Sequence, residues 1–68
     1  MKAEEIKKGD MLAPLEKWNK REKNDKLSTP TEILGVRKEW GCQTGTMVKV
    51  RFENGGEAWL DAAWFGAE

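Results

Sequence analysis

The sequence predicts a mostly β fold, a small domain of four to five short antiparallel strands with a long first loop and a single helical turn near its C-terminal end. Three observations predict it. Thr46–Asp61 is expected to form a β-hairpin, because Val48, Val50 and Phe52 alternate with Met47, Lys49 and Arg51, as in a strand with one buried face. Asn54-Gly55-Gly56 follows closely and favours a tight reversal of the chain. Glycine or proline punctuates the other short apolar segments, as expected where strands end in turns.

Length and composition limit the fold and its partners. Sixty-eight residues make one domain, and a chain of this size buries only about 60% of the surface that it exposes when unfolded. Four tryptophans and two phenylalanines therefore matter for the core, and dimerisation would add further burial. Twelve basic and twelve acidic side chains balance, so the net charge selects no partner.

The expected location follows from the cysteine count and from the apolar runs. The single cysteine, Cys42, cannot form an intramolecular disulfide, which favours a reducing compartment. No apolar run approaches the length of about 18 residues that a membrane span needs, and the first residues lack the apolar stretch of a signal peptide. The sequence therefore predicts a cytoplasmic protein with no membrane partner.

The N-terminal part predicts two short elements before a long loop. Met1–Lys8 suits either a helical turn or an extended strand, and Met11–Ala13 suits a short strand that ends at Pro14. Residues 15–27 are expected to form a long basic loop or a short helix. Leu15 and Trp18 stand at helical spacing, but the segment is otherwise almost entirely polar.

The middle of the chain predicts a second long strand, Glu32–Trp40, in which Gly35 indicates a bulge or bend. Gly41–Gly45 is a glycine-bounded turn that leads into the central hairpin. After the hairpin, Asp61 is expected to cap a single helical turn that Gly66 ends. Trp64 and Phe65 in that turn are expected to close one end of the core.

The loop of the central hairpin decides which face each side chain takes. A two-residue loop would bring Glu57 and Asp61 onto the apolar face, whereas a three-residue loop over Asn54–Gly56 buries no charge and is therefore favoured. That register leaves Trp59 on the outer face, flanked by Lys49 and Arg51. It aligns one inward aliphatic row with another: Ala58, Leu60 and Ala62 with Val48, Val50 and Phe52.

This order of elements resembles the SH3-like barrels over about Ile6–Phe65. Four segments carry the resemblance: KKGDML at Lys7–Leu12, ILGV at Ile33–Val36, VKVRFENGG at Val48–Gly56 and DAAWF at Asp61–Phe65. The resemblance implies a single SH3-like β-barrel over residues 1–68, with four to five antiparallel strands.

Two groups with this architecture set limits on what the resemblance implies. Signalling SH3 domains carry an ALYDY-type motif and tyrosines that bind proline-rich ligands, and this chain has no tyrosine. The plasmid type II dihydrofolate reductases are similar in layout, with a GD opening, an IVG-like second strand and a hairpin before a final turn. Their pore site depends on a VQIY motif, where this chain has EAWLD at Glu57–Asp61. Neither the ligand nor the activity is expected to transfer.

The residue types that catalysis and metal binding need are scarce. The chain has no histidine, and one cysteine cannot build a zinc site. The glycines at Gly41–Gly45 and Asn54–Gly56 match no phosphate-binding loop. We therefore expect a protein that is not an enzyme and that holds no metal or cofactor.

Two segments are candidate binding sites. In the basic segment, Lys17, Lys20 and Arg21 would share one helical face beside Trp18, which suits a nucleic-acid strand because phosphates need cations and bases need a flat ring. The alternative is that the lysines keep a loop soluble while Trp18 folds back onto the core.

The second candidate is the outer face of the hairpin, with Lys49, Arg51 and Trp59. Trp40 would either join this face or lie in the core. The alternative is that the lysine and arginine stems simply cover Trp59. The sequence therefore predicts a non-enzymatic binding module, with a slight preference for nucleic acid. The second hypothesis is a protein-interaction adaptor or small homo-oligomer that uses a tryptophan-rich surface.

Overall fold

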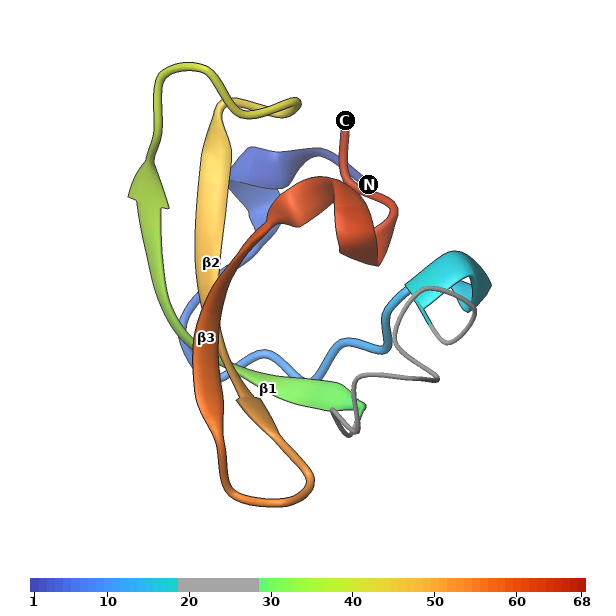
Figure 1. The fold of residues 1–68 in the computed structure, drawn as a ribbon. Coiled ribbons are helices and arrows are strands. Elements are labelled where there is room, and N and C mark those ends of the chain that lie inside the picture. The colour runs from blue at the N-terminus through green and yellow to red at the C-terminus, as the bar shows by residue number, and fades with distance from the viewer. Residues whose placement is uncertain (19–28) are drawn as a thin grey trace.

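The computed structural model describes residues 1–18 and 29–68, drawn as a ribbon in Figure 1. A three-stranded antiparallel sheet in the order β1-β2-β3 dominates this part of the chain. A short 3-10 turn flanks the sheet at either end of the chain, which confirms the predicted mostly β class. The elements are η1 (Ala3–Glu5), β1 (Pro30–Lys38), β2 (Thr46–Phe52), β3 (Glu57–Asp61) and η2 (Ala62–Phe65).

The described ranges contain fewer strands than the four to five that the sequence predicts. The segment expected as a first strand pairs with β1 through a single bridge, between Met11 and Glu32. Next to it, the Gly9 N–H donates to the Ile33 carbonyl at 2.7 Å. The ladder stops there because residues 7–10 form a turn, in which Gly9 takes a φ of 96° and Asp10 N–H donates to the Lys7 carbonyl.

The start of the chain forms a helical turn, η1, which was one of the two alternatives for Met1–Lys8. Ala3 in η1 and Ile6 after it are buried and belong to the core. The two ends of the chain lie side by side (Figure 1). The Ala3 N–H donates to the Glu68 carbonyl at 3.2 Å, and the Glu68 N–H donates to the Met1 carbonyl at 3.0 Å.

The irregularity expected at Gly35 is present in β1. Ile33 pairs with Val50 and Gly35 pairs with Lys49, so one residue of β1 is extra at this point. Such a bulge bends and twists a strand locally. A Cβ built on Gly35 would lie 3.7 Å from the ring of Trp59, which shows how closely that ring approaches the strand.

The central hairpin has the predicted faces but not the predicted register. Val48 pairs with Leu60 and Val50 with Ala58, so the aliphatic rows do face the same side. The loop is one residue earlier than expected: Phe52 N–H donates to the Gly56 carbonyl at 2.7 Å, and Gly55, with a φ of 92°, takes the left-handed position. This moves β3 by two residues along β2, a shift that keeps every side chain on its predicted face.

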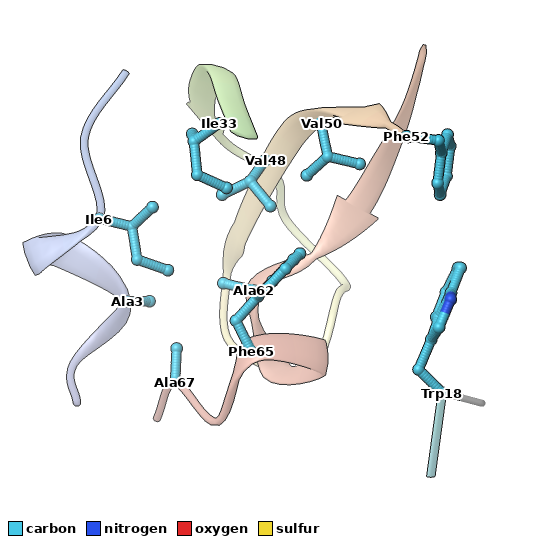
Figure 2. Close-up of a cluster of buried hydrophobic side chains, with 10 residues drawn as sticks. All are labelled: Ala3, Ile6, Trp18, Ile33, Val48, Val50, Phe52, Ala62, Phe65 and Ala67. Carbon is cyan, nitrogen blue, oxygen red and sulfur yellow. The ribbon is translucent and has the colours of Figure 1, made fainter. Parts of the chain in front are cut away.

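The C-terminal turn forms as predicted. The Asp61 side chain accepts a hydrogen bond from the Ala63 N–H, and Gly66 ends the turn with a φ of 81°. Phe65 lies in the core, and Trp64 packs against it while staying half-buried. Figure 2 shows the buried cluster, which the sheet, both 3-10 turns and Trp18 build together. Its members are Ala3, Ile6, Trp18, Ile33, Val48, Val50, Phe52, Ala62, Phe65 and Ala67.

Among residues 1–18 and 29–68, no helix has the length and apolar character that crossing a membrane requires.

Candidate functional site

The outer face of the sheet carries a tryptophan that lies among cations, as the sequence predicts. Trp59 of β3 pairs with Lys49 of β2, and Lys49 pairs in turn with Gly35 of β1. The Trp59 ring reaches across this row to Gly35, where no Cβ stands in its way. The guanidinium of Arg37 lies over the same ring, 4.4 Å from its centroid. The sheet and Arg37 together leave the residue only 37% exposed.

The cations of this face are already paired with carboxylates. Arg51 contacts Glu32 at 2.9 Å, and Lys49 contacts Glu57 at 3.5 Å. Arg37, besides covering Trp59, lies 3.3 Å from Glu39. A phosphate group that bound here would have to displace these carboxylates. The hairpin face is therefore close to neutral rather than cationic.

Trp18 folds back onto the core, which is the second of the two alternatives that the sequence left open. It is 2% exposed, and its ring stacks on Phe52 and meets Trp64 edge to face, with centroids 6.1 and 5.1 Å away. The cause is a set of contacts with distant residues: residues 16–18 form a helical turn, and just before it Leu15 N–H donates to the Trp64 carbonyl at 2.7 Å. A buried ring offers no face on which a base could stack.

Those predicted site residues that the structure describes lie on two different sides of the sheet. The ammonium group of Lys17 lies 5.4 Å from the Trp64 ring centroid, in the aromatic cluster on the inner side of the sheet. Lys49, Arg51 and Trp59 lie on the outer side. Lys20 and Arg21 fall outside the residues that the structure describes.

The most exposed large apolar side chain in the described ranges is Trp40, which is 97% exposed. It lies in the turn between β1 and β2 (Figure 1), where the sequence left open whether it joins the outer face or the core. It does neither. The sequence predicted Trp40 as the last residue of a strand over Glu32–Trp40, but β1 ends two residues earlier, at Lys38. Gly41, which directly follows Trp40, is the only local sign of the turn.

The turn that carries Trp40 is held in place by hydrogen bonds. Glu39 N–H donates to the Gly45 carbonyl at 3.1 Å and closes the turn at its base. The Asp61 carboxylate accepts from Gln43 N–H at 2.7 Å and from the Thr44 hydroxyl at 2.7 Å. It also accepts from Ala63 N–H at 3.0 Å, so one side chain fastens both this turn and η2.

The hydrogen bonds that Asp61 accepts also stabilise its ionised form. Burial on its own would raise the pKa of Asp61, but hydrogen bonds from the Ala63 N–H, the Thr44 hydroxyl and the Gln43 and Thr44 backbones outweigh burial. The pKa therefore lies below the ordinary aspartate value. Trp40 is thus presented on an ordered turn whose anchor is ionised at neutral pH.

Cys42 lies in the same turn, where its thiol donates a hydrogen bond to the Glu39 carbonyl at 3.3 Å. In the part of the chain that the structure describes, histidine, cysteine, aspartate and glutamate side chains form no group of three or more that could hold a metal ion.

Comparison of the chain with models of protein families, with curated proteins and with solved structures found no match.

Proposed function

We propose that this chain is a non-enzymatic binding module that holds a partner protein, and that Trp40 is its main contact. The observation that carries the proposal is the near-complete exposure of an indole on a fastened turn. Tryptophans bury about 150–250 Å² each, which at about 25 cal/mol per Å² is about 4–6 kcal/mol of hydrophobic free energy available to a complex. Tryptophan is also enriched among the residues that dominate protein interfaces.

The fastened turn favours binding because it lowers the entropy cost of forming a complex. A side chain on a flexible loop must be ordered when the partner binds, and this cost reduces the affinity. Here the loop backbone is ordered beforehand by the Asp61 carboxylate and by the Glu39–Gly45 hydrogen bond. Only the rotamers of Trp40 itself remain to be fixed.

A protein partner is favoured over the nucleic acid that the sequence slightly preferred. The predicted stacking ring, Trp18, is buried, and the cations beside Trp59 are paired with carboxylates. Over the whole chain, twelve basic side chains are balanced by twelve acidic ones, so the net charge supplies no excess of positive charge. Phosphate binding depends on excess positive charge, whereas insertion of a tryptophan into an apolar pocket does not.

We also propose that the fold is a small SH3-like barrel. The support is the contact of the N-terminal segment with β1 at Ile33, the two hydrogen bonds between the ends of the chain, and the 3-10 turn that follows β3. These contacts curl the chain around the core from both sides of the sheet. An experimental structure in which residues 7–12 lie away from β1 would contradict this assignment.

The binding proposal is tested by comparing two exposed apolar side chains. Partners are captured from a lysate of cells that express the chain, with wild-type protein, with Trp40→Ala and with the matched control Met11→Ala. Met11 is a suitable control because it is 71% exposed. The partner is then purified and titrated by calorimetry. We expect Trp40→Ala to weaken binding by about 2–4 kcal/mol, and Met11→Ala to change it by less than about 0.5 kcal/mol.

Two results would contradict the proposal. One is a partner that binds wild type and Trp40→Ala equally well. The other is binding of mixed-sequence single-stranded DNA or RNA whose log affinity falls steeply with log salt, since that slope measures phosphate contacts and would restore the nucleic-acid hypothesis.

A further inference from the structure

The edge of β1 directly before Trp40 has backbone groups that no other described residue pairs with. The N-terminal segment meets this edge at Ile33, where Ile33 N–H donates to the Asp10 carbonyl at 2.9 Å and the Ile33 carbonyl accepts from Gly9. The turn at residues 7–10 then leads the N-terminal segment away. From Gly35 onward, no described residue pairs with this side of β1.

The register of β1 against β2 identifies which backbone N–H and C=O groups of β1 point away from β2. Glu39 and Gly45 are a hydrogen-bonded pair, and pairs that exchange hydrogen bonds alternate with pairs that do not in an antiparallel ladder. Arg37 with Met47 is therefore hydrogen-bonded, whereas Val36 with Val48 and Lys38 with Thr46 are not. The N–H and C=O groups of Val36 and Lys38 consequently point away from β2, with the spacing that an added strand needs.

The side chains around this edge combine exposed apolar surface with positive charge that no described carboxylate pairs. Val36 is 39% exposed although it pairs with the buried Val48, and Trp40 stands two residues beyond the end of the strand. Lys38 on the strand and Lys8 in the neighbouring turn have no carboxylate within ion-pair distance among the described residues, unlike the cations on the outer face. An exposed cation without a carboxylate attracts an acidic partner.

A second copy of the chain is a poor occupant for this edge. Antiparallel pairing of two β1 edges would bring Arg37 and Lys38 of one copy beside the same residues of the other, and like charges across a strand pair are destabilising. Lysine on an edge strand is one of the devices that prevent self-pairing. A nucleic-acid strand could use the lysines, but its sugar–phosphate backbone has no amide groups to alternate with those of Val36 and Lys38.

We infer that the β1 edge at residues 36–38 binds an extended, acidic peptide segment of a partner protein, which adds to the sheet as a further strand and places an apolar side chain against Trp40. The main-chain hydrogen bonds supply affinity, and the lysines and the exposed apolar side chains supply the preference for sequence. This inference rests on the proposed function, because it names the partner chemistry and the binding mode of the same surface.

The first experiment is a selection that does not assume a particular peptide. A phage-displayed random library of peptides of about ten residues is selected against wild-type protein and against Trp40→Ala. We expect the enriched peptides to carry more aspartate and glutamate than the starting library, with apolar residues at alternate positions. Enrichment against Trp40→Ala should fall to the background level.

The second experiment locates the peptide on the protein. With one enriched peptide and ¹⁵N-labelled protein, we expect amide shift changes and slowed hydrogen exchange at Val36 and Lys38. A version of the peptide methylated on alternate backbone nitrogens keeps its charges but loses its donors, and should bind about tenfold or more weakly. Lys38→Gln should weaken binding about twofold to fivefold, while the matched change Lys49→Gln on the outer face should not.

The outcomes separate this inference from the proposed function. Peptides with no excess of acidic residues, shift changes away from Val36 and Lys38, or a methylated peptide that binds as tightly as its parent would each overturn the inference. If such peptides still need Trp40, the binding function stands. If no peptide is enriched, the inference is wrong, and Trp40-dependent capture of a folded protein then decides the proposed function. Salt-sensitive binding of oligo-dT at Lys8 and Lys38 would overturn both.

Discussion

Replacing the anchor of the Trp40 turn tests the central structural argument. Asp61→Asn keeps the size of the side chain but removes its charge and gives it one acceptor oxygen instead of two. The Gln43 N–H, which donates to Asp61 at 2.7 Å, would then meet an amide NH₂ group and lose its acceptor. The Thr44 hydroxyl and the Ala63 N–H would donate to a neutral oxygen instead of an ionised one. The substitution therefore loosens the turn and the cap of η2 together.

The expected loss of folding stability follows from these three hydrogen bonds. A hydrogen bond typically contributes about 0.5–1.5 kcal/mol and more to a charged group, and loss of a helix cap costs about 1 kcal/mol. Because Asp61 is only half-buried and asparagine can still accept one or two of the bonds, we expect a loss of about 1–2.5 kcal/mol. For a domain of this size that lowers the melting temperature by about 4–20 °C.

The dependence on pH gives the prediction a second readout. The pKa of Asp61 in the folded protein lies below its value of 3.8 in an unfolded chain. The stability that its ionised form contributes is therefore fully present above pH 3.8, and is lost as the pH falls through the lower pKa of the folded state. The difference in stability between wild type and Asp61→Asn should shrink as the solution is acidified below that value.

Thermal unfolding followed by far-UV circular dichroism, at neutral pH and at a series of acidic pH values, measures both effects. Glu53→Gln is the matched control, because Glu53 is an exposed carboxylate at the hairpin loop and should change stability by less than about 0.5 kcal/mol. Equal melting temperatures for wild type and Asp61→Asn at neutral pH would refute the argument. So would a stability difference that stays constant as the carboxylate is protonated.

The other predictions concern stability and are checked by the same melting experiments. Trp18→Ala should cost about 3–5 kcal/mol and leave the protein largely unfolded, because the ring packs between Phe52 and Trp64. Gly55→Ala should cost about 1–2 kcal/mol, since the residue has a φ of 92°. Gly35→Ala should be neutral or stabilising by up to about 1 kcal/mol, because its φ is ordinary and the added Cβ meets only normal contacts. A stable Trp18→Ala, or a Gly35→Ala that costs more than Gly55→Ala, would contradict the packing described here.

The sequence predicts the faces of the hairpin well because charge decides them. A register that buries the charges of Glu57 and Asp61 is much less stable than one that exposes them, so the inward-facing residues could be predicted from the sequence. The exact register could not. Gly55 and Gly56 are adjacent and chemically equal, and which of them takes the left-handed position depends on the fit of β3 against β2 rather than on either residue.

The candidate site residues were also difficult to predict, because their surroundings depend on residues that are distant in the sequence. The fate of Trp18 depends on Phe52 and Trp64, which lie far from it along the chain, so its polar neighbours suggested an exposed ring. The pairing of Lys49 and Arg51 with carboxylates likewise depends on which strands become neighbours. The exposure of Trp40 was missed for a different reason: the strand was predicted to end at Trp40, whereas β1 ends at Lys38 and the turn that follows exposes the ring.

The mutual hydrogen bonds of the first and last residues have a practical consequence. Because Met1 and Ala3 lie beside Glu68, a short linker could join the two ends, and the chain could be reopened elsewhere without disturbing the sheet order. The loop after β2 is a suitable opening, since its residues are exposed and contribute nothing to the buried cluster. Such a circular permutant would move any fused tag to the far end of the β2–β3 hairpin, away from the corner where residues 1 and 68 lie.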